Sequence, residues 1–320
     1  MVMYRVNSNL QNMKKLLIIA SAAIATLFAG ACQREEVSSA AEEVSVSLSL
    51  QVPSVQTKAM SQAELTDVVY YEIWNSDLTK KLYPLEGQEP VYLAVENCKA
   101  TLDITLVSAQ TYNFIFWAQN KNCGAYDVTD LKSVKVDYSV IGAAGNQDKF
   151  DAFYAVKKIA VAGPINESVT LYRPFAQLNF GADAMTTIFG NVNVGLSSVK
   201  LSSLATQFNT ISGMGEGEKK DVVFNADGIV TDKEALEVNG KSYTWVSMNY
   251  VLMHDQQSVA QVDAEFNLGM DVPVKHSISA VPLKKNYRPN IVGNLFTADA
   301  DLSIVVDPTF AQPDEEIVIK

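Results

Sequence analysis

The sequence predicts an all-β protein that folds as two β-sandwich domains. Short runs rich in Val, Tyr, Phe and Thr follow one another closely and are bounded by Gly, Pro or Asn. One run, residues 44–52, alternates strictly between apolar and polar side chains. Long helical patterns do not separate the runs, as they would in a parallel α/β sheet. The 289 residues that follow the first 31 are also near the size at which a single core divides into two.

The first 31 residues have the pattern of a signal peptide. Lys14 and Lys15 precede an apolar run over residues 16–29, which is shorter than the roughly 20 residues of a membrane span. Ala29-Gly30-Ala31 then places small residues directly before Cys32, an order that resembles a lipobox. We expect cleavage after residue 31 and lipid attachment at Cys32; the alternative is a chance cysteine after an ordinary signal peptide. Residues 32–43, which are polar and acidic, are interpreted as a tether.

The charge of the chain argues against nucleic-acid binding. Removal of residues 1–31 takes away Arg5, Lys14 and Lys15 and no acidic residue, so the net charge changes from −11 to −14. Such a surface repels the phosphate backbone of nucleic acids.

The clearest strand pattern lies at the start of the mature chain. Five apolar side chains alternate with Ser45, Ser47, Ser49 and Gln51, and Pro53 ends the run. A period of two places the apolar set on one face of a strand, and these residues are Val44, Val46, Leu48, Leu50 and Val52. A half-buried strand is therefore predicted for residues 44–52.

Further strands are predicted on both sides of an expected domain boundary near residue 183. The first domain, residues 44–183, also contains runs at 67–74, 101–107, 112–120, 150–158, 167–173 and 175–180. The second domain, residues 184–320, contains runs at 192–203, 243–253, 260–269 and 290–297, followed by short terminal runs at 301–307 and 315–320. Residues 212–221 are interpreted as a loop because they are rich in glycine and charge.

Two cysteines remain beyond Cys32. If residues 101–107 and 112–120 form a hairpin in which Val107 faces Tyr112, Cys98 and Cys123 lie almost opposite each other. A disulfide closing this loop would add about 3 kcal/mol of stability on the chain-entropy model. Two separate thiols are the alternative. A metal site is not expected, because two cysteines without a nearby histidine supply too few ligands.

No catalytic motif or cofactor-binding motif stands out, and we expect no enzyme activity. His254 and His276 lie outside any metal-ligand spacing, and the chain has no P-loop, nucleophile elbow or dinucleotide fingerprint. The three tryptophans could form a sugar-binding platform if they were exposed. Their alternation with other bulky residues favours the core instead, and they are Trp74, Trp117 and Trp245.

Several segments resemble the fimbrillin-like, or Mfa2-like, lipoproteins of Bacteroidota, a group that includes type V pilus subunits. The segment LKKNYRPNIVGNLFT at 283–297 is the most specific, and RPFAQLNF (173–180), FNTISG (208–213) and NFIFWAQN (113–120) are similar to the same family. The resemblance spans nearly the whole mature chain. It implies two transthyretin-like β-sandwiches exported as a lipoprotein.

The resemblance also implies assembly by strand exchange. In polymerising members a protease removes the first strand, and the C-terminal strand of a neighbour fills the groove. The removable strand here would be residues 44–52, and candidate donor side chains are Leu302, Ile304, Val306, Ile317 and Ile319. The family cleaves after arginine, whereas this chain has Lys58 followed by Ala59, which places the stalk role in question.

The function expected from these observations is that of a lipid-anchored outer-membrane lipoprotein at the cell surface or in a fimbrium. It would be a stalk, tip or anchor subunit that serves adhesion, with other pilus subunits as partners and no cofactor. The alternative is a surface lipoprotein that binds glycans or host proteins without polymerising.

Overall fold

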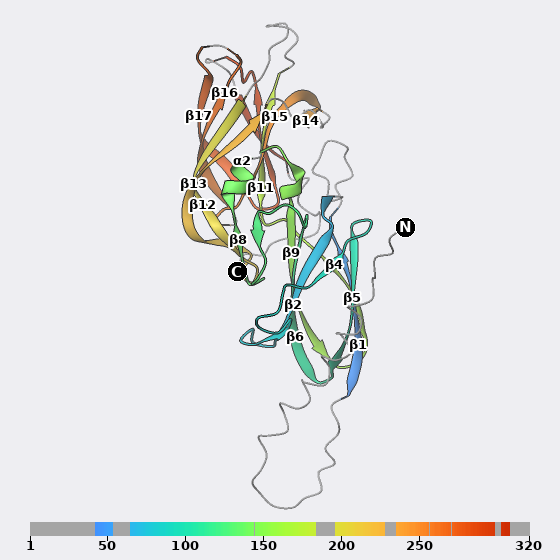
Figure 1. Ribbon diagram of the computed structural model, residues 1–320. Helices are drawn as coiled ribbons and strands as arrows, with labels where there is room; N and C mark the ends of the chain where they lie inside the picture. The colour runs from blue at the N-terminus through green and yellow to red at the C-terminus, as the bar shows by residue number, and fades with distance from the viewer. Residues whose placement is uncertain are drawn as a thin grey trace, which may run out of the picture.

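The structure is a computed structural model, and it describes residues 42–53, 65–143, 145–183, 196–227, 235–255, 257–269, 271–297 and 302–307. Almost every described element is a β-strand, which confirms the prediction of an all-β fold. The strands form two lobes stacked end to end (Figure 1). Within the described residues, no helix is long and apolar enough to cross a membrane.

The first lobe is a sandwich of two sheets. Sheet A has the order β10-β1-β5, with bounds Ile165–Thr170, Glu43–Gln51 and Lys99–Val107. In sheet B the order is β3 (Lys81–Tyr83), β2 (Val68–Asn75), β6 (Gln110–Gln119) and β9 (Ala152–Val161). The short strand β4 (Tyr92–Ala94) also pairs β2. β1 is therefore the central strand of its sheet.

The second lobe contains two larger sheets. In sheet C the order is β17 (Val274–Lys284), β16 (Gln257–Phe266), β12 (Leu196–Asn209), β8 (Ser133–Val136) and β7 (Tyr126–Asp127). The strand β13 (Met214–Asp227) also pairs β12. In sheet D the order is β14 (Leu236–Val238), β15 (Lys241–Val251), β11 (Ala176–Ala182), β18 (Arg288–Gly293) and β19 (Leu302–Asp307). The short helix α2 (Tyr138–Ala143) and the 3₁₀ turn η2 (Asp148–Phe150) follow β8.

Sheet B belongs to two cores at once. One face, with Val69, Tyr71 and Ile73, packs against sheet A in the first core. The opposite face, with Tyr70 and Trp74, packs into the core of the second lobe. This division follows from the two-residue period of a strand, since neighbouring residues point to opposite faces. Both faces of β2 are apolar because both are covered.

The three tryptophans lie in the core, as predicted. Trp74, Trp117 and Trp245 are 7%, 0% and 1% exposed. Their indole N–H groups donate hydrogen bonds to Glu72 at 2.9 Å, Gln119 at 2.8 Å and the carbonyl oxygen of Ser247 at 3.2 Å. An exposed tryptophan platform for sugars is therefore ruled out.

The predicted hairpin over residues 101–120 is wrong. β5 pairs β1 in sheet A, whereas β6 pairs β2 and β9 in sheet B. The chain crosses from one sheet to the other through Ser108 and Ala109, with a positive φ of 56° at Ala109. The two strands consequently face each other across the first core instead of sharing a hydrogen-bond ladder.

The predicted loop at residues 212–221 is also wrong. Most of it belongs to β13, which pairs β12 from Met214 to Asp227. Gly215 is needed because a Cβ there would lie 2.2 Å from the carbonyl oxygen of Met253. The charged residues 218–221 are exposed on this outer strand, so charge and glycine are compatible with strand structure here.

The boundary expected at residue 183 stays a prediction. The strand pairing crosses it, since β8 pairs β12 and β11 pairs β15 and β18. Residues 126–136 and 176–182 therefore lie in sheets of the second lobe.

Candidate functional site

The site with the strongest structural definition is the position of β1 in sheet A, which we call the β1 slot. β1 pairs antiparallel with β5 along all nine of its residues and parallel with β10 from Val46 to Gln51. Beyond its ends, Val52 donates to the carbonyl oxygen of Cys98 at 2.9 Å, and Ser108 donates to that of Glu42 at 2.7 Å. Without β1, both β5 and β10 would present unpaired backbone groups to the gap.

The side chains of β1 divide between core and surface as the sequence predicts. The apolar set Val44, Val46, Leu48, Leu50 and Val52 is 6%, 1%, 0%, 0% and 3% exposed. On the other face Ser45 and Gln51 are exposed, while Ser47 and Ser49 are half-buried. The β1 slot is thus a two-sided backbone ladder with a row of five apolar side chains on its inner face.

The opposite wall of the first core is aromatic. Phe114 and Phe116 of β6 are fully buried and have ring centroids 6.1 Å apart. Tyr71 of β2 stacks on Tyr83 with centroids 5.6 Å apart, and burial raises the pKa of Tyr71. Because these rings are flat and apolar, a strand in the β1 slot is selected by the shape and hydrophobicity of its inward side chains rather than by their charge.

The C-terminal candidate strand has a different setting. β19 is an edge strand that pairs β18 antiparallel along its whole length. Leu302 is half-buried and packs against the second core, whereas Ile304 and Val306 are 37% and 36% exposed. The candidate donor residues Ile317 and Ile319 lie outside the described residues.

The cysteines do not have the relation that the hairpin implied. Cys98 lies in the turn before β5 and packs against the first core, while Cys123 is buried in the core of the second lobe. Cys123 is a free thiol whose pKa is raised by burial. The register argument for a disulfide therefore fails, because β5 and β6 are in different sheets. The lipid-attachment residue Cys32 and the cleavage residues Lys58 and Ala59 lie outside the described residues.

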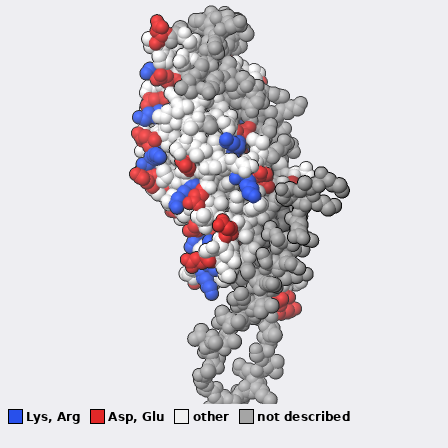
Figure 2. All heavy atoms as spheres, in the orientation of Figure 1, with Lys and Arg blue, Asp and Glu red and all other residues white. Residues whose placement is uncertain are grey.

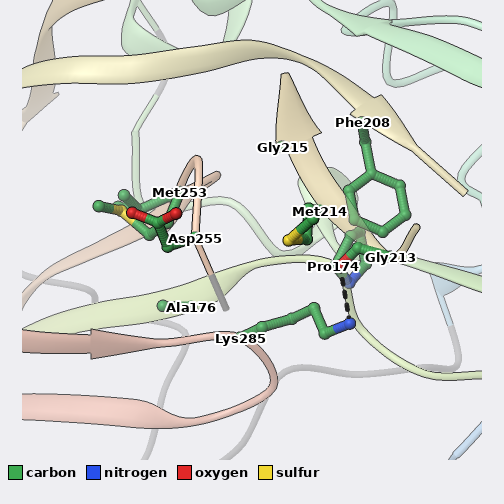
Figure 3. A pocket seen from close by; sticks show the side chains of 10 residues that line it. Pro174, Ala176, Phe208, Gly213, Met214, Gly215, Met253, Asp255 and Lys285 are labelled. Atoms are coloured by element: carbon green, nitrogen blue, oxygen red, sulfur yellow. Dashed lines mark hydrogen bonds between the residues drawn. The ribbon is translucent and has the colours of Figure 1, made fainter. Parts of the chain in front are cut away.

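A shallow hollow lies in the second lobe, close to where it meets the first (Figure 3). It lies among Pro174, Phe208, Met214, Met253 and Lys285, and its side chains leave no room for a water molecule. The ammonium of Lys285 donates to the carbonyl oxygen of Gly213 at 2.9 Å and to the hydroxyl of Tyr154 at 2.7 Å. Because Tyr154 belongs to β9 of the first lobe, this contact ties the lobes together.

Metal chemistry finds no support in the part of the chain that the structure describes. No cluster of three or more His, Cys, Asp or Glu side chains occurs there. The imidazole Nε2 of His276 lies 2.7 Å from the carbonyl oxygen of Leu295, so this buried histidine has a structural partner.

The outer face of sheet C is covered by charges of both signs. Figure 2 shows acidic and basic side chains interspersed on the face in view. Lys275 pairs with Glu265 at 2.9 Å, and Lys200 lies 3.9 Å from Asp221. The described part of this face presents no basic patch for an anionic partner.

Sequence reasoning missed two buried ion pairs. Arg173 is 1% exposed, and its Nε donates to both carboxylate oxygens of Asp151 at 2.9 and 2.8 Å. Arg288, also 1% exposed, pairs with Asp307 at the end of β19. Both arginines precede a proline and a run of largely buried residues, but the Arg-Pro dipeptide by itself indicates neither the burial of the arginine nor its acidic partner.

Solved structures with a similar fold include a protein from Bacteroidota. A protein described as a "putative adhesin" from Bacteroides thetaiotaomicron has 11% identity and a TM-score of 0.50, covering 83% of this chain and 96% of its own. At this identity the likeness shows the fold, and it confirms the sequence resemblance at that level.

Two further structures have lower TM-scores. The tip fimbrial protein Mfa3 from Porphyromonas gingivalis has 8% identity, a TM-score of 0.46, and coverage of 83% of this chain and 99% of its own. A fimbrial assembly protein from Parabacteroides distasonis has 12% identity, a TM-score of 0.45, and coverage of 83% and 100%.

No curated protein sequence matches the chain. A family profile matches residues 37–320, which is most of the sequence. The chain therefore belongs to the family described as a family of unknown function, DUF6562.

Proposed function

We propose that this protein is a lipid-anchored surface subunit of a fimbria that assembles by strand exchange at the β1 slot and serves adhesion. The observation that carries the proposal is the setting of β1, a central strand with five buried apolar side chains and hydrogen-bonded neighbours on both sides. Lipid attachment at Cys32, cleavage at Lys58 and an outer-membrane location belong to the same proposal. The protein from Bacteroides thetaiotaomicron that is described as a "putative adhesin" supports it as an analogue of fold.

A β1 slot filled by another strand is more stable than an empty slot. Burying each Val or Leu side chain contributes about 1.5–3 kcal/mol, and the emptied slot would also expose the edges of β5 and β10. A cleaved β1 is therefore expected to stay bound until another strand with the same alternation displaces it. Cleavage frees β1 from the rest of the chain, and its displacement by a strand of another subunit then joins the two subunits.

Limited digestion of the mature chain with a lysine-specific protease tests the proposal. Mass spectrometry should show a cut after Lys58, and gel filtration should then show oligomers that lack residues 32–58. The Lys58→Gln variant, which removes the cleavage site, is the matched control and should remain monomeric. A chain that is cut at Lys58 and yet stays monomeric contradicts assembly by this route.

A synthetic peptide of residues 43–53 provides a second arm. It should compete with the donor and shorten the oligomers, because it carries the native apolar row of the slot. A control peptide in which Leu48 and Ser49 are exchanged breaks the alternation and should not compete.

The alternative, a glycan-binding lipoprotein with an exposed tryptophan face, is not favoured. All three tryptophans are buried, so the surface feature on which that hypothesis depended is missing.

A further inference from the structure

Within the described residues, sheet D ends at β19, and this end strand lacks the features that usually keep a strand edge from pairing with another protein. Such features are prolines, charged side chains, bulges and short length. The longer end strands of the other sheets have them: Pro282 in β17, Lys158 in β9, Asp103 in β5 and the inward-facing Glu167 in β10. The end strands β3, β7 and β14 have three residues or fewer. β19 has the sequence LSIVVD, and its single charge is the last residue, which pairs with Arg288.

Half of the backbone groups of β19 face its outer edge. The odd-numbered residues at β18 bond β11, since the N–H groups of Gln177 and Asp183 donate to the carbonyl oxygens of Tyr287 and Gly293 at 3.1 and 2.8 Å. The direction of these groups alternates along a strand, so the even-numbered residues of β18 face β19. Their partners in β19 are Ser303, Val305 and Asp307. The N–H and C=O groups that β18 does not bind belong to the other three residues, Leu302, Ile304 and Val306.

The same edge exposes apolar side chains. Ile304 and Val306 are 37% and 36% exposed, while Leu302 and Val305 are half-buried. Backbone donors and acceptors along an edge, together with an exposed apolar row, are what an added strand binds in β-augmentation. The edge of β19 is therefore an interaction surface for another extended strand.

We propose that β19 pairs with β19 of a second copy of this chain, antiparallel and about a twofold axis at Val305. In this register Ile304 lies opposite Val306 of the second copy, so the two exposed apolar side chains cover each other. Ser303 lies opposite Asp307 of the second copy, and a serine hydroxyl can donate to a carboxylate. The pairing joins the two copies of sheet D into one continuous sheet with an isologous interface.

Symmetry and charge select this register. Directly opposed residues of an antiparallel pair share a face, so a twofold axis through the sheet has to pass through a residue. An axis at Ile304 would bring Asp307 opposite Asp301 of the second copy, and like charges directly opposite each other are destabilising. An axis at Val306 would place Ile304 opposite Pro308, which has no N–H to donate. The axis at Val305 avoids both conflicts.

The pairing is independent of the β1 slot and goes beyond the proposed strand exchange. One pair of edges six residues long buries less surface than the roughly 1,200 Å² of a stable interface. The dimer is therefore weak. Dilute protein should be monomeric in gel filtration, and dimers should form where copies of the chain are concentrated.

Disulfide trapping tests the register in a chain that carries Cys32→Ser, Cys98→Ser and Lys58→Gln, so that strand exchange does not start. Val305→Cys places two thiols in a non-hydrogen-bonded pair, with Cα atoms about 4.5 Å apart. Ser303→Cys is the matched control: it is more exposed and lies on the same face, but its Cα atoms are about 14 Å apart along the ladder. A disulfide requires Cα atoms within about 7 Å. On oxidation of concentrated protein, Val305→Cys should form dimers and Ser303→Cys should not.

Equal cross-linking of the two variants would indicate random collision and contradict the pairing. So would the absence of dimers in a Val305→Cys chain that keeps its melting temperature. Sedimentation equilibrium of the Lys58→Gln chain without added cysteines gives a second measurement. Its average mass should rise with concentration, and Ile304→Lys should abolish the rise because it places a charge on the edge. Val259→Lys, at a residue 67% exposed in β16, is the control and should keep the rise; the same behaviour in both variants would also overturn the proposal.

Discussion

Charged residues that the sequence places at strand ends are among the most buried in the molecule. Arg173 precedes Pro174, which keeps it extended, and a position at a strand end is compatible with exposure. In the structure Arg173 and Asp151 are each 1% exposed, and the guanidinium also lies over the ring of Phe153 at 4.5 Å. No local pattern indicates this burial, because Asp151 is 22 residues away and meets Arg173 only when β9 is in place.

The Asp151→Asn variant is expected to destabilise the fold by roughly 3–5 kcal/mol, because it removes the carboxylate charge beside a guanidinium that water does not reach. Urea denaturation followed by tryptophan fluorescence measures the change. Glu265→Gln, which breaks the exposed pair with Lys275, is the control and should cost less than about 1 kcal/mol. Equal effects of the two variants would contradict a structural role for the buried pair.

Individual strands were well predicted, whereas their partners were not. The alternation of residues 44–52 was sufficient for β1 because one face of the strand is buried and the other is not. A turn between two runs, however, is equally compatible with a hairpin and with a crossing between facing sheets. Residues 108 and 109 illustrate the second case, and only the positions of β1 and β2 as competing partners decide it.

At the scale of the strand, Leu48→Ala in β1 should lower the free energy of unfolding by about 2–5 kcal/mol, since Leu48 is fully buried in the middle of the apolar row. Ser47→Ala, next to it on the outer face, should change stability by no more than about 0.5 kcal/mol. Chemical denaturation of both variants checks the difference. Similar losses in the two would mean that the inner face of β1 contributes little to the first core.

The two lobes behave as one packed body in the structure because their cores meet at sheet B. Phe208 of β12 contacts Trp117 of β6 and Tyr154 of β9, with ring centroids 6.0 and 4.6 Å apart. Lys132 from the second lobe lies over the indole of Trp74 at 3.8 Å. The sequence suggested two separate sandwiches. The largely apolar run of β2 is typical of a strand that is covered on both faces, but it does not say which residues cover the second face.

This packing predicts a single cooperative thermal transition for the described fold. Phe208→Ala should separate it into two, because the variant removes ring contacts that join the lobes. Phe224→Ala is the control: Phe224 is also buried, but its ring partner Tyr138, at 6.0 Å, lies in the same lobe. Both variants should cost about 3–5 kcal/mol, and differential scanning calorimetry distinguishes them. A single transition in Phe208→Ala would contradict the coupling of the lobes through this ring.

β1 has one parallel and one antiparallel neighbour, and this affects the direction in which another strand could bind in its place. One wall of its position, β10, runs in the same direction as β1, and the other, β5, runs in the opposite direction. A guest segment that entered head-first or tail-first would meet one wall of each kind, so the main chain alone does not select an orientation. The orientation of a guest strand in the slot must then come from how its side chains fit against the buried aromatic rings of the first core.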